Sequence, residues 1–179
     1  MGFSESSVLL KIALVVLPLA LILHIAGLAT PNWSSASASA NGQSVSSTAG
    51  LWKACLEGGG EKLCESYETV LDWIKACQAF GIIGVLAVAA AAILEVLCTV
   101  VFSKDTHKVA YILAAMTAFS GAGCIIVTAI IWAAKASEIS SLLDLSWSFG
   151  LSIAGGVLAG IGGVLGAIDL CQTSLQSGM

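Results

Sequence analysis

Apolar residues gather in four long runs along the chain, separated by short polar or charged segments. The runs cover residues 12–29, 76–102, 109–134 and 145–168. Each is long enough to cross about 30 Å of hydrocarbon at about 1.5 Å per helical residue. They lack the strict alternation of barrel strands, and only helices or closed barrels satisfy their backbone groups inside a bilayer. The pattern therefore predicts four membrane-spanning helices packed as one bundle.

Composition supports a membrane protein and excludes several functions. The chain is 58% hydrophobic and 10% charged, whereas a soluble domain of this length carries about 25% charged residues. A net charge of −4 argues against a nucleic-acid partner, and membrane lipids are the expected surroundings. The six cysteines show no C-x-x-C spacing, so neither a metal site nor a cofactor is expected. No nucleophile stands near a base and an orienting group, so we predict no enzyme.

The lysines indicate which loops are cytoplasmic. Segment 103–108 is short and carries two lysines, and Lys11 flanks the start of the first run. Positive charge in short loops stays on the cytoplasmic side of a membrane. We therefore expect this loop, the N-terminus and the tail 169–179 to be inside, and the loops 30–75 and 135–144 to be outside. The predicted location is the plasma membrane, with several passes.

The first outer loop carries the most specific signal of the chain, a set of tryptophans and cysteines spaced as W-x18-W-x2-C-x8-C. Its members are Trp33, Gly50, Leu51, Trp52, Cys55 and Cys64. Because the exterior is oxidising, a Cys55–Cys64 bridge is expected, and closing so short a loop stabilises by roughly 3 kcal/mol. Three consecutive glycines between Glu57 and Glu61 have the composition of a hairpin turn. The alternatives are two free thiols or an intermolecular bridge.

This motif, placed between the first and second of four spans, resembles the signature of the claudin superfamily. That superfamily includes claudins, peripheral and epithelial myelin-type membrane proteins, and calcium-channel gamma subunits. The resemblance covers nearly the whole chain and implies that the first outer loop folds as a small antiparallel sheet, joined by a strand from the second. From the residues alone, 34–48 fits either a flexible linker or a solvated strand. The predicted fold is one claudin-like domain over 1–179: a membrane α-helical four-helix bundle with a disulfide-bonded extracellular β-sheet.

The two tryptophans of the motif are given different roles. Trp33 directly follows the first span, where a tryptophan at the membrane interface is the ordinary interpretation. Trp52 lies too far along the loop for that interpretation to suffice. The resemblance implies that Gly50-Leu51-Trp52 packs at the membrane-facing base of the sheet and anchors the sheet to the bundle.

The last span is rich in glycine and repeats small residues at every fourth position. The small positions on which the prediction rests are Ser152, Gly156, Gly160 and Gly163. Such faces let helices approach closely. We expect this face to pack within one chain, and lateral assembly or docking on a larger membrane protein is the alternative.

Three polar or reactive residues in or just after the predicted spans also have expected roles. Glu95 is the only acid inside a predicted span, and a structural pair with Lys11 or a protonated carboxyl is expected there. His24 is interpreted as a hydrogen-bonded core histidine. Cys171 follows the last predicted span on the inner side, where palmitoylation and a free thiol are equally acceptable.

The resemblance leaves two hypotheses for function. In the first, copies assemble side by side at cell–cell junctions and form or modulate a paracellular barrier or path. In the second, the protein is an auxiliary, gamma-type subunit that docks on an ion channel or receptor. A membrane-organising role of the myelin type lies between them. The short second outer loop, the absence of a Tyr-Val-type tail and Lys75 in place of an arginine depart from claudins.

Charge in the first outer loop sets an expectation for the junction hypothesis. Loop 30–75 holds five acidic residues and three lysines, a net charge of −2. Carboxylates that line a narrow aqueous path concentrate cations there. Glu57, Glu61 and Glu65 are therefore predicted to give a mild cation preference, and a merely solvated acidic face is the alternative.

Overall fold

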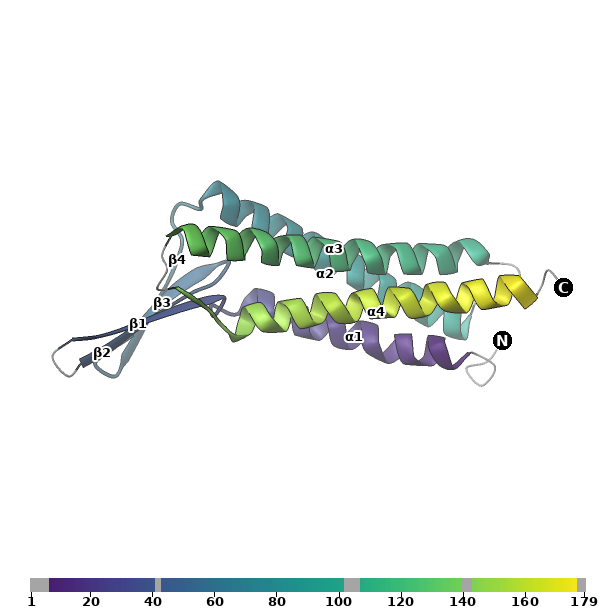
Figure 1. The fold of residues 1–179 in the computed structure, drawn as a ribbon, viewed down its shortest axis with the longest axis horizontal. Coiled ribbons are helices and arrows are strands. Elements are labelled where there is room, and N and C mark those ends of the chain that lie inside the picture. The colour runs from purple at the N-terminus through teal and green to yellow at the C-terminus, as the bar shows by residue number, and fades with distance from the viewer. Residues whose placement is uncertain (1–6, 41–42, 102–106, 140–142, 177–179) are drawn as a thin grey trace.

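Four long helices form the body of the protein in a computed structural model that describes residues 7–40, 43–101, 107–139 and 143–176 (Figure 1). They are α1 (Val8–Ala29), α2 (Asp72–Val100), α3 (Lys108–Ile139) and α4 (Trp147–Gln176). All four are long and apolar enough to cross a membrane. The predicted spans are therefore confirmed as helices.

The helices pack in a ring in which α1 contacts α2 and α4, and α3 contacts α2 and α4. Small side chains fill much of the interior, among them Ala20, Ala91 and Ala118. Large apolar side chains such as Leu86 and Ile130 point outward instead. A bundle surrounded by lipid gains nothing from burying large apolar groups, so close approach through small residues dominates its packing.

The helices differ from the predicted spans at their ends, and α1 and α2 each begin four residues earlier than predicted, at Val8 and Asp72. α3 continues past residue 134 to Ile139, and α4 continues past residue 168 to Gln176. Leu145, expected to begin the last span, lies in a strand instead. The first helix begins at a cap, where the hydroxyl of Ser7 accepts a hydrogen bond from the backbone N–H of Leu10.

The two loops predicted to lie outside the cell build one antiparallel sheet of five strands in the order β4-β3-β2-β1-β5. The strands are β1 (Ser34–Ala40), β2 (Gln43–Ala49), β3 (Lys53–Gly58), β4 (Glu61–Ser66) and β5 (Asp144–Leu145). Residues 34–40 and 43–48 are thus strand and not linker, because the two stretches pair with each other in register. β5 joins the sheet from the second outer loop, as the resemblance implied.

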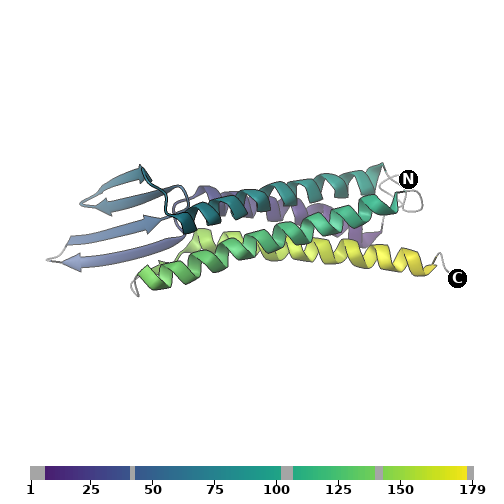
Figure 2. The same cartoon turned by 90° about the horizontal axis from the view of Figure 1, so that it is seen from above.

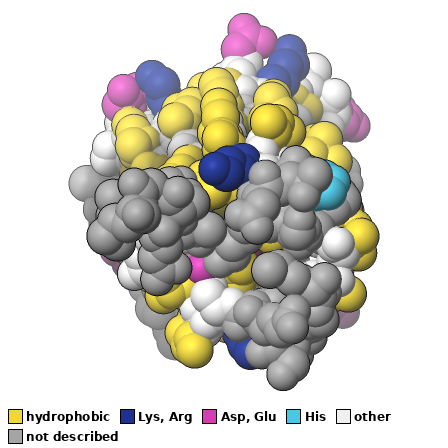
Figure 3. All heavy atoms as spheres, turned by 90° about the vertical axis from the view of Figure 1, so that its right-hand side faces the viewer, with side chains coloured by type: hydrophobic (Ala, Val, Ile, Leu, Met, Phe, Trp, Pro, Cys, Tyr) yellow, Lys and Arg dark blue, Asp and Glu magenta, His cyan; other side chains and the backbone are white. Residues whose placement is uncertain are grey.

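The sheet projects from one end of the bundle and continues its long axis (Figures 1 and 2). α1 begins and α4 ends at the opposite end, which Figure 3 views directly. The start of α1 and the end of α4 therefore lie on the same side of the membrane. Which side of the membrane that is stays a prediction from the lysines.

Candidate functional site

A disulfide closes the hairpin of β3 and β4. Cys55 and Cys64 are directly opposite in the strand register, and their sulfur atoms are bonded. At the turn, Gly59 and Gly60 have φ angles of 64° and 87°, which glycine adopts without the penalty of a Cβ atom. The predicted bridge and the predicted turn are both confirmed.

Trp33 is completely buried where the sheet meets the helices. Its indole nitrogen donates a hydrogen bond to the carbonyl of Gly27 over 2.8 Å. The ring centroid lies 5.4 Å from that of Trp132 and 5.8 Å from that of Phe149. The interpretation of Trp33 as an interfacial tryptophan is therefore wrong: a paired N–H and neighbouring aromatic rings make it part of the core.

Gly50 allows two stretches of backbone to touch at the base of the sheet. A Cβ atom added there would lie 2.6 Å from Cα of Pro31 and 2.8 Å from the carbonyl oxygen of Thr30. The hydroxyl of Tyr67 donates to the Gly50 carbonyl over 2.8 Å. Burial raises the pKa of the Tyr67 phenol, which favours the neutral form that can donate.

The next two residues fasten the sheet to α1 and α2. Leu51 is completely buried, and its carbonyl accepts a hydrogen bond from the side-chain amide of Gln78 in α2 over 2.8 Å. The indole nitrogen of Trp52 donates to the carbonyl of Leu28 in α1, also over 2.8 Å. The Gly-Leu-Trp segment therefore bridges the first two helices at the joint between sheet and bundle.

The strand register separates the three glutamates of the predicted ion path. Residues directly opposite share a face, so Glu57 lies on the disulfide side of the β3–β4 hairpin. Glu61 and Glu65 lie on the other side. The amine of Lys62 is 3.9 Å from the Glu57 carboxylate, and both side chains are largely exposed. The structure thus places two of the three glutamates on one face of the hairpin, and it places a lysine beside the third.

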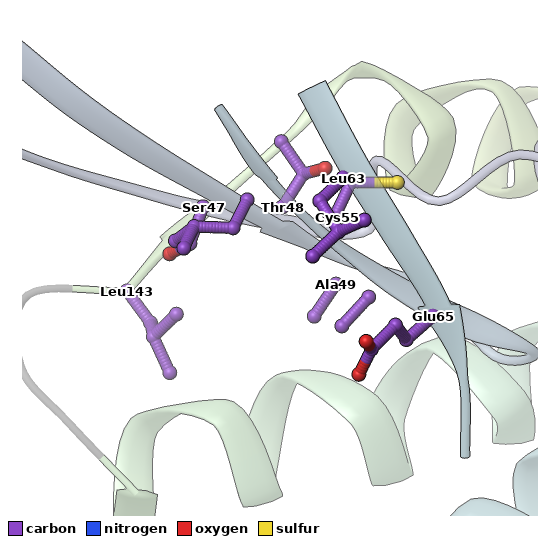
Figure 4. A pocket seen from close by; sticks show the side chains of 9 residues that line it. Ser47, Thr48, Ala49, Cys55, Leu63, Glu65 and Leu143 are labelled. Carbon is purple, nitrogen blue, oxygen red and sulfur yellow. The ribbon is translucent and has the colours of Figure 1, made fainter. Parts of the chain in front are cut away.

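The face that carries Glu61 and Glu65 is otherwise mainly apolar. Leu56 and Leu63 are directly opposite each other there and are 54% and 63% exposed, and Val45 on β2 is 41% exposed. We call Val45, Leu56 and Leu63 the apolar sheet patch. A groove of about 370 Å³ borders the patch, with Leu63 and Glu65 contributed by the strands and Leu143 by the second outer loop (Figure 4). Large exposed apolar side chains in water mark surfaces that associate.

Comparison with known families agrees with this architecture. Residues 5–166 match the model of the PMP-22/EMP/MP20/Claudin family. The chain belongs to this family. No curated protein matches the sequence at a significant level. Family membership points to a structural or channel-associated protein and not to an enzyme.

The described residues were also compared with the requirements of a metal site. Among those residues, no three His, Cys, Asp or Glu side chains are grouped so that they would hold a metal ion.

The predicted small face of α4 packs on α3 and α1 within the same chain. A Cβ atom on Gly156 would lie 2.9 Å from Cγ2 of Ile125, and one on Gly163 would lie 3.3 Å from Cβ of Ala118. Gly160 is less tight, at 3.8 Å from Cβ of Ala122. Ser152 is buried, and its hydroxyl contacts His24 of α1. This small face therefore serves contacts between helices of one chain.

A second glycine row on α4 was not singled out from the sequence. A Cβ atom on Gly155 would lie 2.8 Å from the carbonyl oxygen of Ala20, and one on Gly162 would lie 2.6 Å from Cδ2 of Leu17. Both neighbours belong to α1. The signal that would have found this row is its seven-residue spacing, which keeps two positions on one side of a helix.

His24 joins three helices in the half of the bundle nearer the sheet. It is completely buried, its Nδ1 lies 2.8 Å from the hydroxyl of Ser152, and its Nε2 lies 3.1 Å from the carbonyl oxygen of Gly81. A carbonyl can only accept, so Nε2 carries the hydrogen and the serine donates to Nδ1. The prediction of a hydrogen-bonded core histidine is confirmed.

The structure adds a second acid to the end of the bundle away from the sheet. Glu95 is buried in α2, and its Oε2 lies 4.0 Å from where a Cβ on Gly166 would be. Asp169, which the sequence placed in the tail, is buried in α4 one turn beyond Gly166. The pairing of Glu95 with Lys11 stays a prediction.

The cysteines outside the disulfide differ in access. Cys77 and Cys98 are buried, and Cys124 is half-buried. Cys171 is exposed on α4 near its end. An exposed thiol is reachable, and its lipidation stays a prediction.

Proposed function

We propose that this protein acts at contacts between cells, where copies assemble side by side and form or modulate a barrier or a path between neighbouring cells. Family membership supports this proposal, because adhesion and barrier formation belong to the functions that the family resemblance implies. The extracellular sheet is the part of the chain that would carry it.

The apolar sheet patch is the observation that favours assembly. Leu56 and Leu63 are more than half exposed, and the sheet that carries them projects beyond the ends of the helices (Figure 1). Lipid hydrocarbon does not reach a sheet that stands in water, so burial of these side chains requires protein. A patch of large apolar side chains on such a surface is typical of a protein–protein contact.

A second function, an auxiliary subunit of a channel or receptor, is favoured by the length of the second outer loop. α3 extends to Ile139, β5 begins at Asp144, and α4 begins at Trp147. Few residues therefore remain to project from this loop, which claudins use in contacts between cells. In this alternative the apolar sheet patch would contact the extracellular domain of the partner.

Localisation and purification together distinguish the two functions. A fluorescent fusion in epithelial cells should form continuous lines at cell borders, and two differently tagged copies should purify together. A single large channel or receptor that co-purifies from native tissue, with no association between tagged copies, would favour the auxiliary subunit.

A further inference from the structure

We infer that the groove between the sheet ends of α1 and α2 binds one acyl chain of a phospholipid in the leaflet nearest the sheet. The groove has a volume of about 350 Å³. Its lining side chains are apolar and come from α1, α2 and the loop before β3: Ile25, Leu28, Ala29, Trp52, Ile82 and Val85. We call it the α1–α2 groove.

The floor of the α1–α2 groove is a fixed contact between the two helices. The side chain of Leu28 lies directly over Gly81, where an added Cβ atom would be 2.6 Å from Cδ1 of the leucine. One turn away on α1, His24 donates from Nε2 to the carbonyl of Gly81 over 3.1 Å. A hydrogen bond and the packing of the Leu28 side chain on Gly81 therefore hold the helices at this separation.

Trp52 covers the end of the groove towards the sheet. Its indole N–H is held by the carbonyl of Leu28, which is itself a lining residue. The ring position is therefore coupled to the floor. Whatever fills the groove also supports the segment that fastens the sheet to the bundle.

The groove opens to the hydrocarbon of the membrane. Ile25 and Ile82 line it from opposite helices, and each is 44% exposed in a helix that is long and apolar enough to cross a membrane. Water would find no hydrogen-bond partners in a lining of apolar side chains. An empty groove would leave those side chains without contacts on one side. A chain of methylene groups satisfies both conditions.

The polar groups at the groove favour an acyl chain over a sterol. The N–H of Trp52 is already bonded to the carbonyl of Leu28, so this donor is not left to meet a sterol hydroxyl. An acyl chain needs no partner inside the groove, because its polar end stays in the headgroup layer. This inference goes beyond the proposed function, since the groove lies in the membrane and not on the apolar sheet patch.

Fluorescence quenching by brominated lipids tests the inference on the full chain in vesicles. Vesicles of phosphatidylcholine with brominated acyl chains are compared with the unbrominated lipid, and the difference between wild type and Trp52→Phe isolates the signal of Trp52. Ile82→Phe fills the groove from α2, and Ala29→Leu narrows it from α1. Ile83→Phe is the matched control, because Ile83 is the next residue, is 50% exposed and does not line the groove.

We expect brominated chains to quench Trp52 strongly, both filling variants to lose most of that quenching, and Ile83→Phe to retain it. Equal quenching in the filling variants and the control would overturn the inference. A brominated sterol and a phospholipid with brominated chains are also compared, each at the same mole fraction in unbrominated phospholipid. Stronger quenching of Trp52 by the sterol would likewise overturn the inference. If Ile82→Phe fails to fold, Ala29→Leu carries the same comparison from the other helix.

Discussion

The indole nitrogen of Trp132 in α3 donates a hydrogen bond to the hydroxyl of Ser34 in β1 over 2.8 Å. Both residues are buried, and 98 positions separate them in the chain. The bond therefore ties the first strand of the sheet to the third helix. Together with the Trp52–Leu28 bond it fixes the sheet to opposite sides of the bundle.

Removing this tie should loosen the sheet. Ser34→Ala should lower the free energy of unfolding by about 1–3 kcal/mol, because it leaves the buried N–H of Trp132 without an acceptor. Chemical or thermal unfolding in detergent measures the change. Ser37→Ala, on an exposed position of the same strand, should stay within about 0.5 kcal/mol of wild type. Equal effects of the two substitutions would show that the bond does not matter.

The disulfide should be required for delivery to the cell surface. Cys55→Ser or Cys64→Ser should cost roughly 3 kcal/mol and retain the protein inside the cell, because the open hairpin lacks a core of its own. Surface biotinylation measures delivery, and peptide mapping without reduction identifies the bridge. Cys124→Ser, which removes a half-buried free thiol, is the control and should reach the surface. Normal delivery of the Cys55 and Cys64 variants would contradict this role.

The glycines of α4 should differ in their tolerance of a larger side chain. Gly155→Ala should destabilise by about 1–3 kcal/mol, because its added Cβ meets the backbone of α1, which cannot move aside as a side chain can. Gly123→Ala on α3 meets nothing within 4 Å and should leave stability unchanged or slightly higher. Thermal stability in detergent compares the two. Gly156→Leu should likewise cost more than Gly160→Leu, and a reversed order would contradict the packing described.

If the protein lines a path between cells, the glutamates on the two faces of the sheet should contribute differently to its ion preference. Neutralising Glu61 and Glu65 together to Gln should reduce cation preference more than Glu57→Gln, because Lys62 already offsets Glu57. Dilution potentials across an epithelial monolayer measure this, and the difference should grow at low salt, where screening is weaker. Unchanged potentials in protein that is present at cell borders would remove these glutamates from the path.

Hydropathy and local chemistry were sufficient for much of this fold. Runs of apolar residues located all four helices, since a bilayer permits few other structures. Three glycines between two cysteines located the hairpin and its bridge, because both signals are local. The end of α4 was missed, because its buried Asp169 lowers local hydropathy without ending the helix.

Tertiary relationships decided what the sequence left open. Trp33 lies in the core because Trp132 and Phe149, from helices distant in the sequence, pack against it. The residues next to Trp33 in the chain therefore did not predict its burial. The division of the glutamates between two faces depends on the pairing of β3 with β4. A shift of this register by one residue would have placed all three glutamates on one face.

Association between copies of variants of the apolar sheet patch gives the most direct evidence on assembly. Leu56→Ser with Leu63→Ser removes one cross-strand apolar pair, and Glu57→Ser with Lys62→Ser removes the neighbouring pair on the other face without a change in net charge. Two tagged copies are expressed in epithelial cells, cross-linked at the surface and purified through one tag. We expect the leucine variant to lose most of the recovered partner and the charge-pair variant to retain it. Equal recovery from both variants, with both present at the surface, would contradict assembly through this patch.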